Sequence, residues 1–216
     1  MHRRSLLLVS LTALATLAQA GPPLVCHPFD TGGAKSLPWA ASANWNSPDR
    51  SYDLKRLVPD TLSLLAPETA VLVRMETMRR AAIYANKDPR IAYELLSRLM
   101  ARALESGSAL ALFDAGYLVE TYKQVHMADR AAGYVPLAMD LDGYAWVVKA
   151  IRLGGDAASM EFAAALMGDR PWPNEHFRKA LAASSEGSLL ATNIVHQFGE
   201  GKQTLSDLRA RYGNGK

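Results

Sequence analysis

The carboxylate with the clearest chemical setting in the sequence belongs to Glu105, which is followed by Ser106 and Gly107. A glutamate at a helix end can act as a general acid where an apolar pocket raises its pKa. Gly107 marks the end of the preceding predicted helix, because glycine readily takes the left-handed conformation that ends helices. The alternative is therefore a solvated glutamate ahead of a helix stop. We favour this alternative, since three matching residues are a weak signal.

The pair Glu105-Ser106 resembles part of the catalytic motif of the lytic transglycosylases, which are exported, all-α enzymes. The resemblance implies a cell-wall glycan-cleaving enzyme in which Glu105 is catalytic. The chain continues with Ser108-Ala109-Leu110 and lacks the glycine-leucine-methionine-glutamine element that this family carries downstream. We keep glycan cleavage as the enzymatic alternative.

A polar and aromatic stripe follows one side of the next predicted helix. Tyr117, Glu120, Lys123 and Gln124 recur at spacings of three and four, which places them on one helix face. In a curled stack of helices, such a face can line a groove that binds a peptide. The alternative is an ordinary exposed helix surface, on which Glu120 pairs with Lys123 or Gln124.

Neither a metal site nor a cofactor is expected. Cys26 has no second cysteine to pair with, and adjacent residues such as His27 point in opposite directions along an extended chain. Asp140 and Asp142 stand where a helix begins, so we interpret them as caps and not as a calcium or acid–base pair. The other candidate ligands lie on separate predicted helices: His126, His176 and His196.

The first 20 residues have the order of an export signal. Arg3 and Arg4 precede an apolar run from Leu6 to Leu17, and Ala18-Gln19-Ala20 is a small-x-small cleavage pattern. The run is too short to span a bilayer comfortably. We expect cleavage near Ala20 and a periplasmic or secreted protein.

Composition excludes several classes of function for the mature chain. Without Arg3 and Arg4, 22 basic residues face 21 acidic ones, so no clustered basic charge is present to bind nucleic acid. The sequence after the signal contains no segment long and apolar enough for a membrane span. With 49% hydrophobic residues the chain can build a core.

Residues 21–50 are expected to form an extended arm. Five prolines prevent a continuous helix there, yet the segment contains Trp39 and Trp45. Exposure of so much aromatic surface is unfavourable, so we expect the arm to lie against the helical body. Tryptophans that remain exposed can stack on sugars, and a glycan-binding module using Trp39, Trp45 or Trp172 is a further alternative.

Residues 51–216 are expected to form a helical domain. Apolar residues recur at spacings of three and four, and no segment shows strand alternation with hairpin turns. The fold class is therefore all-α, built as a series of αα-hairpins in a curl or compact bundle. The expected helices cover about 52–65 (interrupted by Pro59), 67–86, 88–107, 108–127, 140–154, 156–167, 174–185, 188–198 and 203–212.

Two stretches resemble the tetratricopeptide and Sel1-like helical-repeat families. Residues 111–118, Ala-Leu-Phe-Asp-Ala-Gly-Tyr-Leu, resemble the small-x-x-x-small-Gly-Tyr part of a repeat, and residues 161–166 resemble a repeat helix. The resemblance covers residues 67–200 and implies a scaffold that binds peptides or proteins, without catalytic residues. The chain is also similar to exported bacterial proteins of unknown function. Our leading hypothesis is a non-catalytic scaffold of the cell envelope that binds a peptide or an envelope protein.

Overall fold

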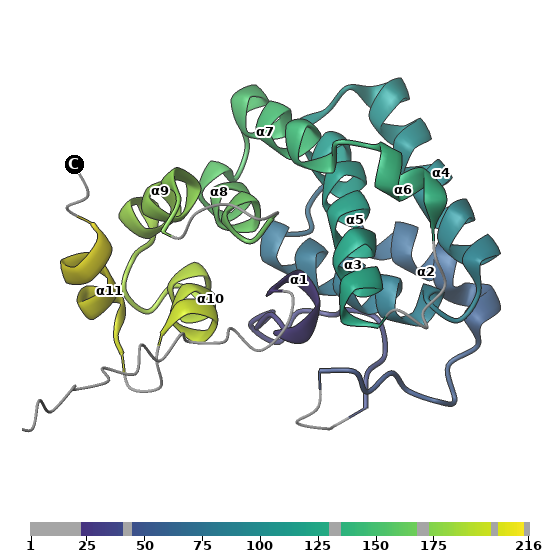
Figure 1. Ribbon diagram of the computed structural model, residues 1–216, viewed down its shortest axis with the longest axis horizontal. Coiled ribbons are helices and arrows are strands. Elements are labelled where there is room, and N and C mark those ends of the chain that lie inside the picture. The colour runs from purple at the N-terminus through teal and green to yellow at the C-terminus, as the bar shows by residue number, and fades with distance from the viewer. Residues whose placement is uncertain (1–22, 41–44, 130–134, 168–172, 200–202, 214–216) are drawn as a thin grey trace, which may run out of the picture.

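The described part of the chain is entirely helical apart from loops and one bridge. The computed structural model describes residues 23–40, 45–129, 135–167, 173–199 and 203–213. The predicted signal segment and Trp172 lie outside these residues. Within them the only β-type pairing is an isolated antiparallel bridge between Trp39 and Pro48. The all-α class predicted from the sequence is confirmed for this part of the chain (Figure 1).

Eleven α-helices and one 3-10 helix occur among the described residues. In chain order they are α1 (Pro23–Cys26), η1 (Leu54–Arg56), α2 (Leu57–Leu64), α3 (Val71–Ala85), α4 (Pro89–Ser106), α5 (Ala109–Ala128), α6 (Pro136–Asp140), α7 (Gly143–Leu153), α8 (Ala157–Ala165), α9 (Glu175–Ala183), α10 (Leu189–Phe198) and α11 (Leu205–Tyr212). None of these helices combines the length and the hydropathy that crossing a membrane requires.

Local capping chemistry sets several of the helix boundaries. The side chains of Asp88, Ser108 and Asp142 accept hydrogen bonds from backbone N–H groups at the starts of α4, α5 and α7. Gly107 ends α4 with a φ of 58°, the left-handed conformation that glycine adopts without a Cβ clash. These boundaries agree with those expected from the sequence.

Several local predictions need correction. Pro59 does not interrupt the helix expected near residues 52–65, because it lies in the first turn of α2, where its missing N–H costs no intrahelical hydrogen bond. Residues 23–26 form the short helix α1, so the chain is not extended at Cys26. Asp140 ends α6 and does not begin a helix.

Pro67 does not begin α3: residues 66–69 form a turn, closed by the N–H of Thr69 donating to the carbonyl of Ala66, and the helix starts at Val71. Proline fixes φ at a value that suits a turn as well as a first helical position. The sequence analysis also missed α6, whose five residues are too few to show a period.

Helix α5 is the centre of the body, because α1, α3, α4, α6 and α7 all contact it. Its closest neighbour is α7, and the two backbones meet at Gly116 and Gly143. A Cβ built on Gly116 would lie 2.5 Å from the carbonyl oxygen of Gly143, and one on Gly143 would lie 2.4 Å from that of Gly116. Only glycine at both positions allows this crossing.

Helices α8 to α11 group at the opposite end of the molecule from α2 to α6 (Figure 1). Helix α8 contacts α7 and α9, while α11 contacts α9 and α10. An aromatic cluster fills this end, with edge-to-face contacts that link Phe162, Phe177, Phe198 and Tyr212. Such contacts add to the burial of the rings themselves.

Candidate functional site

The N-terminal arm, here the described residues 23–40 and 45–49, packs into the helical body. Four of its apolar side chains are at most 4% exposed: Leu24, Val25, Phe29 and Leu37. The ring of Phe29 also makes an edge-to-face contact with Phe162 of α8, 133 positions away in the chain. The arm is therefore part of the core and not a linker.

The main chain of the arm is held by side chains of the helical body. We call these side chains the arm-binding surface: Glu76, Arg79, Arg80 and Tyr84 of α3, Gln124 of α5, and Asn193 and Gln197 of α10. Apart from α1 and the bridge between Trp39 and Pro48, the arm has no regular secondary structure to satisfy its backbone groups, so these groups must find partners elsewhere. Here those partners come from three helices that are far apart in the sequence.

Helix α10 holds the arm by a two-way contact. The N–H of Asp30 donates to Oδ1 of Asn193 at 2.9 Å, and Nδ2 of Asn193 donates to the carbonyl of Asp30 at 3.0 Å. One amide side chain thus satisfies both backbone groups of one residue. Gln197, one turn further on, donates to the carbonyl of His27 at 3.2 Å.

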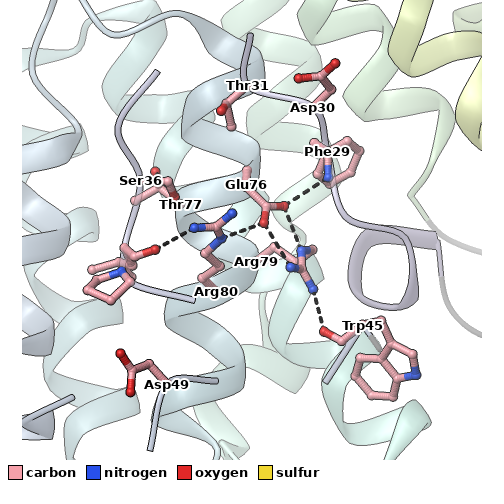
Figure 2. Close-up of polar contacts among 12 residues, drawn as sticks. Phe29, Asp30, Thr31, Ser36, Trp45, Asp49, Glu76, Thr77, Arg79 and Arg80 are labelled. Atoms are coloured by element: carbon pink, nitrogen blue, oxygen red, sulfur yellow. Dashed lines mark hydrogen bonds and ion pairs between the residues drawn. The ribbon is translucent and has the colours of Figure 1, made fainter. Parts of the chain in front are cut away.

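Helix α3 holds the arm through its basic side chains (Figure 2). Nη1 of Arg79 donates to the carbonyls of Val25 at 3.1 Å and Trp45 at 3.0 Å, so it joins two separate parts of the arm. Nη1 of Arg80 donates to the carbonyl of Leu37 at 2.6 Å. The guanidinium groups bind backbone carbonyls. Every residue has a backbone carbonyl, so these contacts do not depend on the side chains of the bound segment.

Glu76 is the hub of this network (Figure 2). Its fully buried carboxylate accepts from Nε and Nη2 of Arg79, from Nε of Arg80, and from the backbone N–H of Phe29 at 3.0 Å. Each of these bonds is charge-assisted, and Arg79 is also fully buried. The ion pair fixes the orientation of both guanidinium groups, which in turn fix the carbonyls of the arm.

Aromatic contacts complete the attachment of the arm. The guanidinium of Arg79 lies 5.0 Å from the ring centre of Trp39, and that of Arg80 lies 5.7 Å away, both within the range of a cation–π contact. The hydroxyl of Tyr84 donates to the carbonyl of Pro38 and accepts from the N–H of Asp49. Burial raises the pKa of Tyr84, which keeps this hydroxyl protonated.

Three of the four members of the predicted peptide-binding stripe are buried and Lys123 is half-buried, so the stripe does not line an open groove. Tyr117 is fully buried, and burial together with the nearby Glu76 carboxylate raises the pKa of its hydroxyl well above 10. Glu120 is 7% exposed and pairs with Lys123 at 2.8 Å. Gln124 accepts from the N–H of Leu24 in α1 at 2.8 Å, so it is the member of the stripe that contacts the arm. The stripe is covered because α5 has neighbours on nearly all sides.

Glu105 lies exposed at the rim of a cavity of about 510 Å³. The cavity wall also includes Arg74, Arg102 and Asp114. Glu105 is therefore exposed to solvent, as we expected, and it also borders a pocket, as the catalytic alternative requires. A glutamate that acts as a general acid is enclosed by apolar groups, whereas the side chain of Glu105 is exposed.

The remaining candidates take structural positions. Cys26 is half-buried in α1, and burial raises the pKa of its thiol, so it is protonated at neutral pH. Asp142 caps α7, and Asp140 is an exposed residue at the end of α6. Among the described residues no three histidine, cysteine, aspartate or glutamate side chains lie close enough to hold a metal ion.

The structure also joins residues that the sequence analysis did not connect. The hydroxyl of Tyr144 lies 2.6 Å from Nε2 of His176, and Nδ1 of His176 pairs with Glu161. Lys179 lies 3.8 Å from the same glutamate. The chain of contacts links α7, α8 and α9, and only the packing of these helices brings its members together.

The sequence analysis also missed the residues that bind the arm, although the spacing of the charged residues in α3 indicated ion pairs. Arg79 and Arg80 follow Glu76 by three and four positions, the spacing of helical ion pairs. These charges lie in a helix whose residues are almost all buried, and buried charges require partners. Asn193 and Gln197 gave no such signal.

Comparison with known proteins gives no relative: no protein-family model, no curated protein and no solved structure matches this chain.

Proposed function

We propose that the protein is an exported, non-catalytic helical scaffold that binds a polypeptide segment at its arm-binding surface. The observation that carries the proposal is the way in which the body holds the arm. Side chains from α3, α5 and α10 bind the backbone N–H groups of Leu24, Phe29 and Asp30 and a series of arm carbonyls. In the structure, the protein's own N-terminal arm occupies this surface.

Main-chain recognition makes the surface suitable for other segments. Backbone groups are the same in every non-proline residue, so specificity depends on the apolar anchors. In the arm these are the Leu24–Val25 pair, Phe29 and Leu37, which are all buried. We therefore expect the partner to be a segment that holds an aliphatic pair in a short helical turn, as in α1, with an aromatic residue four or five positions further on.

The predicted export signal is compatible with this arrangement. The first buried residue in the described part of the arm is Leu24, four positions after the expected cleavage site at Ala20. Cleavage there would leave every arm contact described above in the mature chain. We propose that the protein acts in the periplasm or outside the cell.

The test uses a labelled peptide of residues 23–40 and a full-length variant whose own arm is weakened. Phe29→Ala combined with Leu37→Ala removes two buried anchors from the arm without changing the arm-binding surface. We expect this variant to bind the peptide in a fluorescence-anisotropy titration. The wild type should bind it at least tenfold more weakly, because a tethered arm competes at high effective concentration.

A second substitution identifies the binding surface. Adding Asn193→Leu to the weakened variant removes both hydrogen bonds to Asp30 and should lower peptide affinity about tenfold or more. Thr192→Ala is the matched control, since it changes an exposed neighbour on the same helix. The proposal fails if the weakened variant binds no peptide, or if Asn193→Leu and Thr192→Ala have the same effect.

A further inference from the structure

A cavity between the end of α4 and the start of α5 has the features of a small-ligand site, separate from the arm-binding surface. Its volume of about 510 Å³ suits a ligand of the size of one or two amino acids. Leu65, Pro67 and Leu110 contribute apolar surface to its wall. Its charged groups come from α3, α4 and α5.

One acidic group in the cavity wall is Asp114. This residue is 1% exposed, and its Oδ2 accepts from Nη1 of Arg74 at 2.6 Å. Arg74 is held in turn by the carbonyls of Thr69 and Ala66 and is also 1% exposed. Oδ1 of Asp114 has no hydrogen-bond partner among the described residues. A buried carboxylate oxygen without a donor is unfavourable, so a ligand that brings a donor gains at this point.

The wall of the cavity also carries positive charge. Arg102 lies in the wall and donates one hydrogen bond to the carbonyl of Leu65, which leaves further N–H groups on its guanidinium. The first turn of α5 is also in the wall, from Ser108 to Ala111. The start of this 20-residue helix presents backbone N–H groups and the positive end of the helix dipole.

We propose that this cavity binds a small zwitterion, an amino acid or a dipeptide, by its two charged ends. The ammonium group donates to Oδ1 of Asp114, with Glu105 at the rim as a second acidic group. The carboxylate binds Arg102 and the start of α5. Two acidic and two basic side chains line the cavity, so the site favours a ligand that carries both charges and no net charge.

The protonation of Asp114 gives this site a pH dependence. Burial raises the pKa of Asp114 to about 7, against the opposing effect of Arg74 and, more weakly, of Arg102. Arg74, Arg102 and Glu105 are the charged side chains that share the cavity with it. An ammonium group binds the ionised carboxylate, so binding should be tighter at pH 8 than at pH 6.

The test is a calorimetric titration of the full-length protein with four probes. Alanyl-alanine carries both charges, N-acetyl-alanyl-alanine lacks the ammonium, alanyl-alanine amide lacks the carboxylate, and glucose carries hydroxyl groups alone. We expect alanyl-alanine to bind and each of the other three to bind at least tenfold more weakly. Equal binding of all four probes, tightest binding of glucose, or no binding of alanyl-alanine up to about 10 mM overturns the proposal.

Two variants test which residues bind the ammonium and the carboxylate of the ligand. Asp114→Asn keeps the shape and the contact with Arg74 but removes the charge, and should weaken alanyl-alanine binding at least tenfold at pH 8. Arg102→Gln, at a half-buried position, should weaken binding as well and serves if Asp114→Asn folds poorly. Asp140→Asn, at an exposed position on α6, is the control and should change nothing. If both cavity variants bind like the control, the site is not the one described here.

Discussion

The strongest prediction concerns Glu76, whose carboxylate connects α3 to the arm. Glu76→Gln keeps the size of the side chain and removes its charge. Four hydrogen bonds converge on this carboxylate, and both it and the Arg79 guanidinium are fully buried. The substitution therefore leaves a buried cation without its counter-charge, which typically costs about 3–5 kcal/mol of unfolding free energy.

This loss is large compared with the whole stability of a domain, which is about 5–15 kcal/mol. For a chain of this length, 1 kcal/mol corresponds to about 2–4 °C in the melting temperature. We expect Glu76→Gln to lower the melting temperature by roughly 6–20 °C. The measurement is thermal and urea unfolding followed by circular dichroism at 222 nm, with Glu94→Gln as the control at an exposed glutamate of α4.

Hydrogen exchange then shows whether Glu76→Gln destabilises the attachment of the arm. The amide of Phe29 donates to Glu76, so its exchange should accelerate more than that of amides within α5. A loss of less than 1 kcal/mol relative to Glu94→Gln would refute the reasoning, because the network would then not stabilise the fold. Unchanged protection of the Phe29 amide would refute its connection to the arm.

Three further predictions test other parts of the structure. Gly116→Ala should lower the free energy of unfolding in urea by about 1–3 kcal/mol, since its Cβ would meet a backbone oxygen of α7. In Gly33→Ala the new Cβ meets no atom, so this variant measures the cost of a positive φ alone. Ser108→Ala removes the cap of α5 and should cost about 1 kcal/mol by the same method; no loss would contradict the capping role. Raising the pH from 5 to 8 should lower the free energy of unfolding by about 2–3 kcal/mol through the Asp114 carboxyl. The folded state keeps this proton up to about pH 7, whereas the unfolded state releases it near pH 4, so rising pH favours unfolding. Asp114→Asn should remove that part of the pH dependence, and an identical pH profile in the variant would contradict the assignment.

The sequence determined the class of the fold and many of its boundaries. Asp88 and Ser108 cap the starts of α4 and α5, and Gly107 with its positive φ caps the end of α4, so each boundary is set by a residue next to it in the chain. The prolines and tryptophans of residues 21–50 also indicated an arm that packs on the body. These features depend on local chemistry, which a sequence displays directly.

The binding surfaces depended on tertiary structure. The spacing of Tyr117 and Glu120 showed that they share a helix face, but the packing of several helices around α5 decided that the face is covered. Asn193 contacts Asp30 across 163 positions, and no local pattern marks either residue for the other. Asp114 likewise became part of a cavity wall only when α3 and α4 were placed beside α5. A side chain's neighbours follow from how distant helices pack, and that packing is a property of the whole chain.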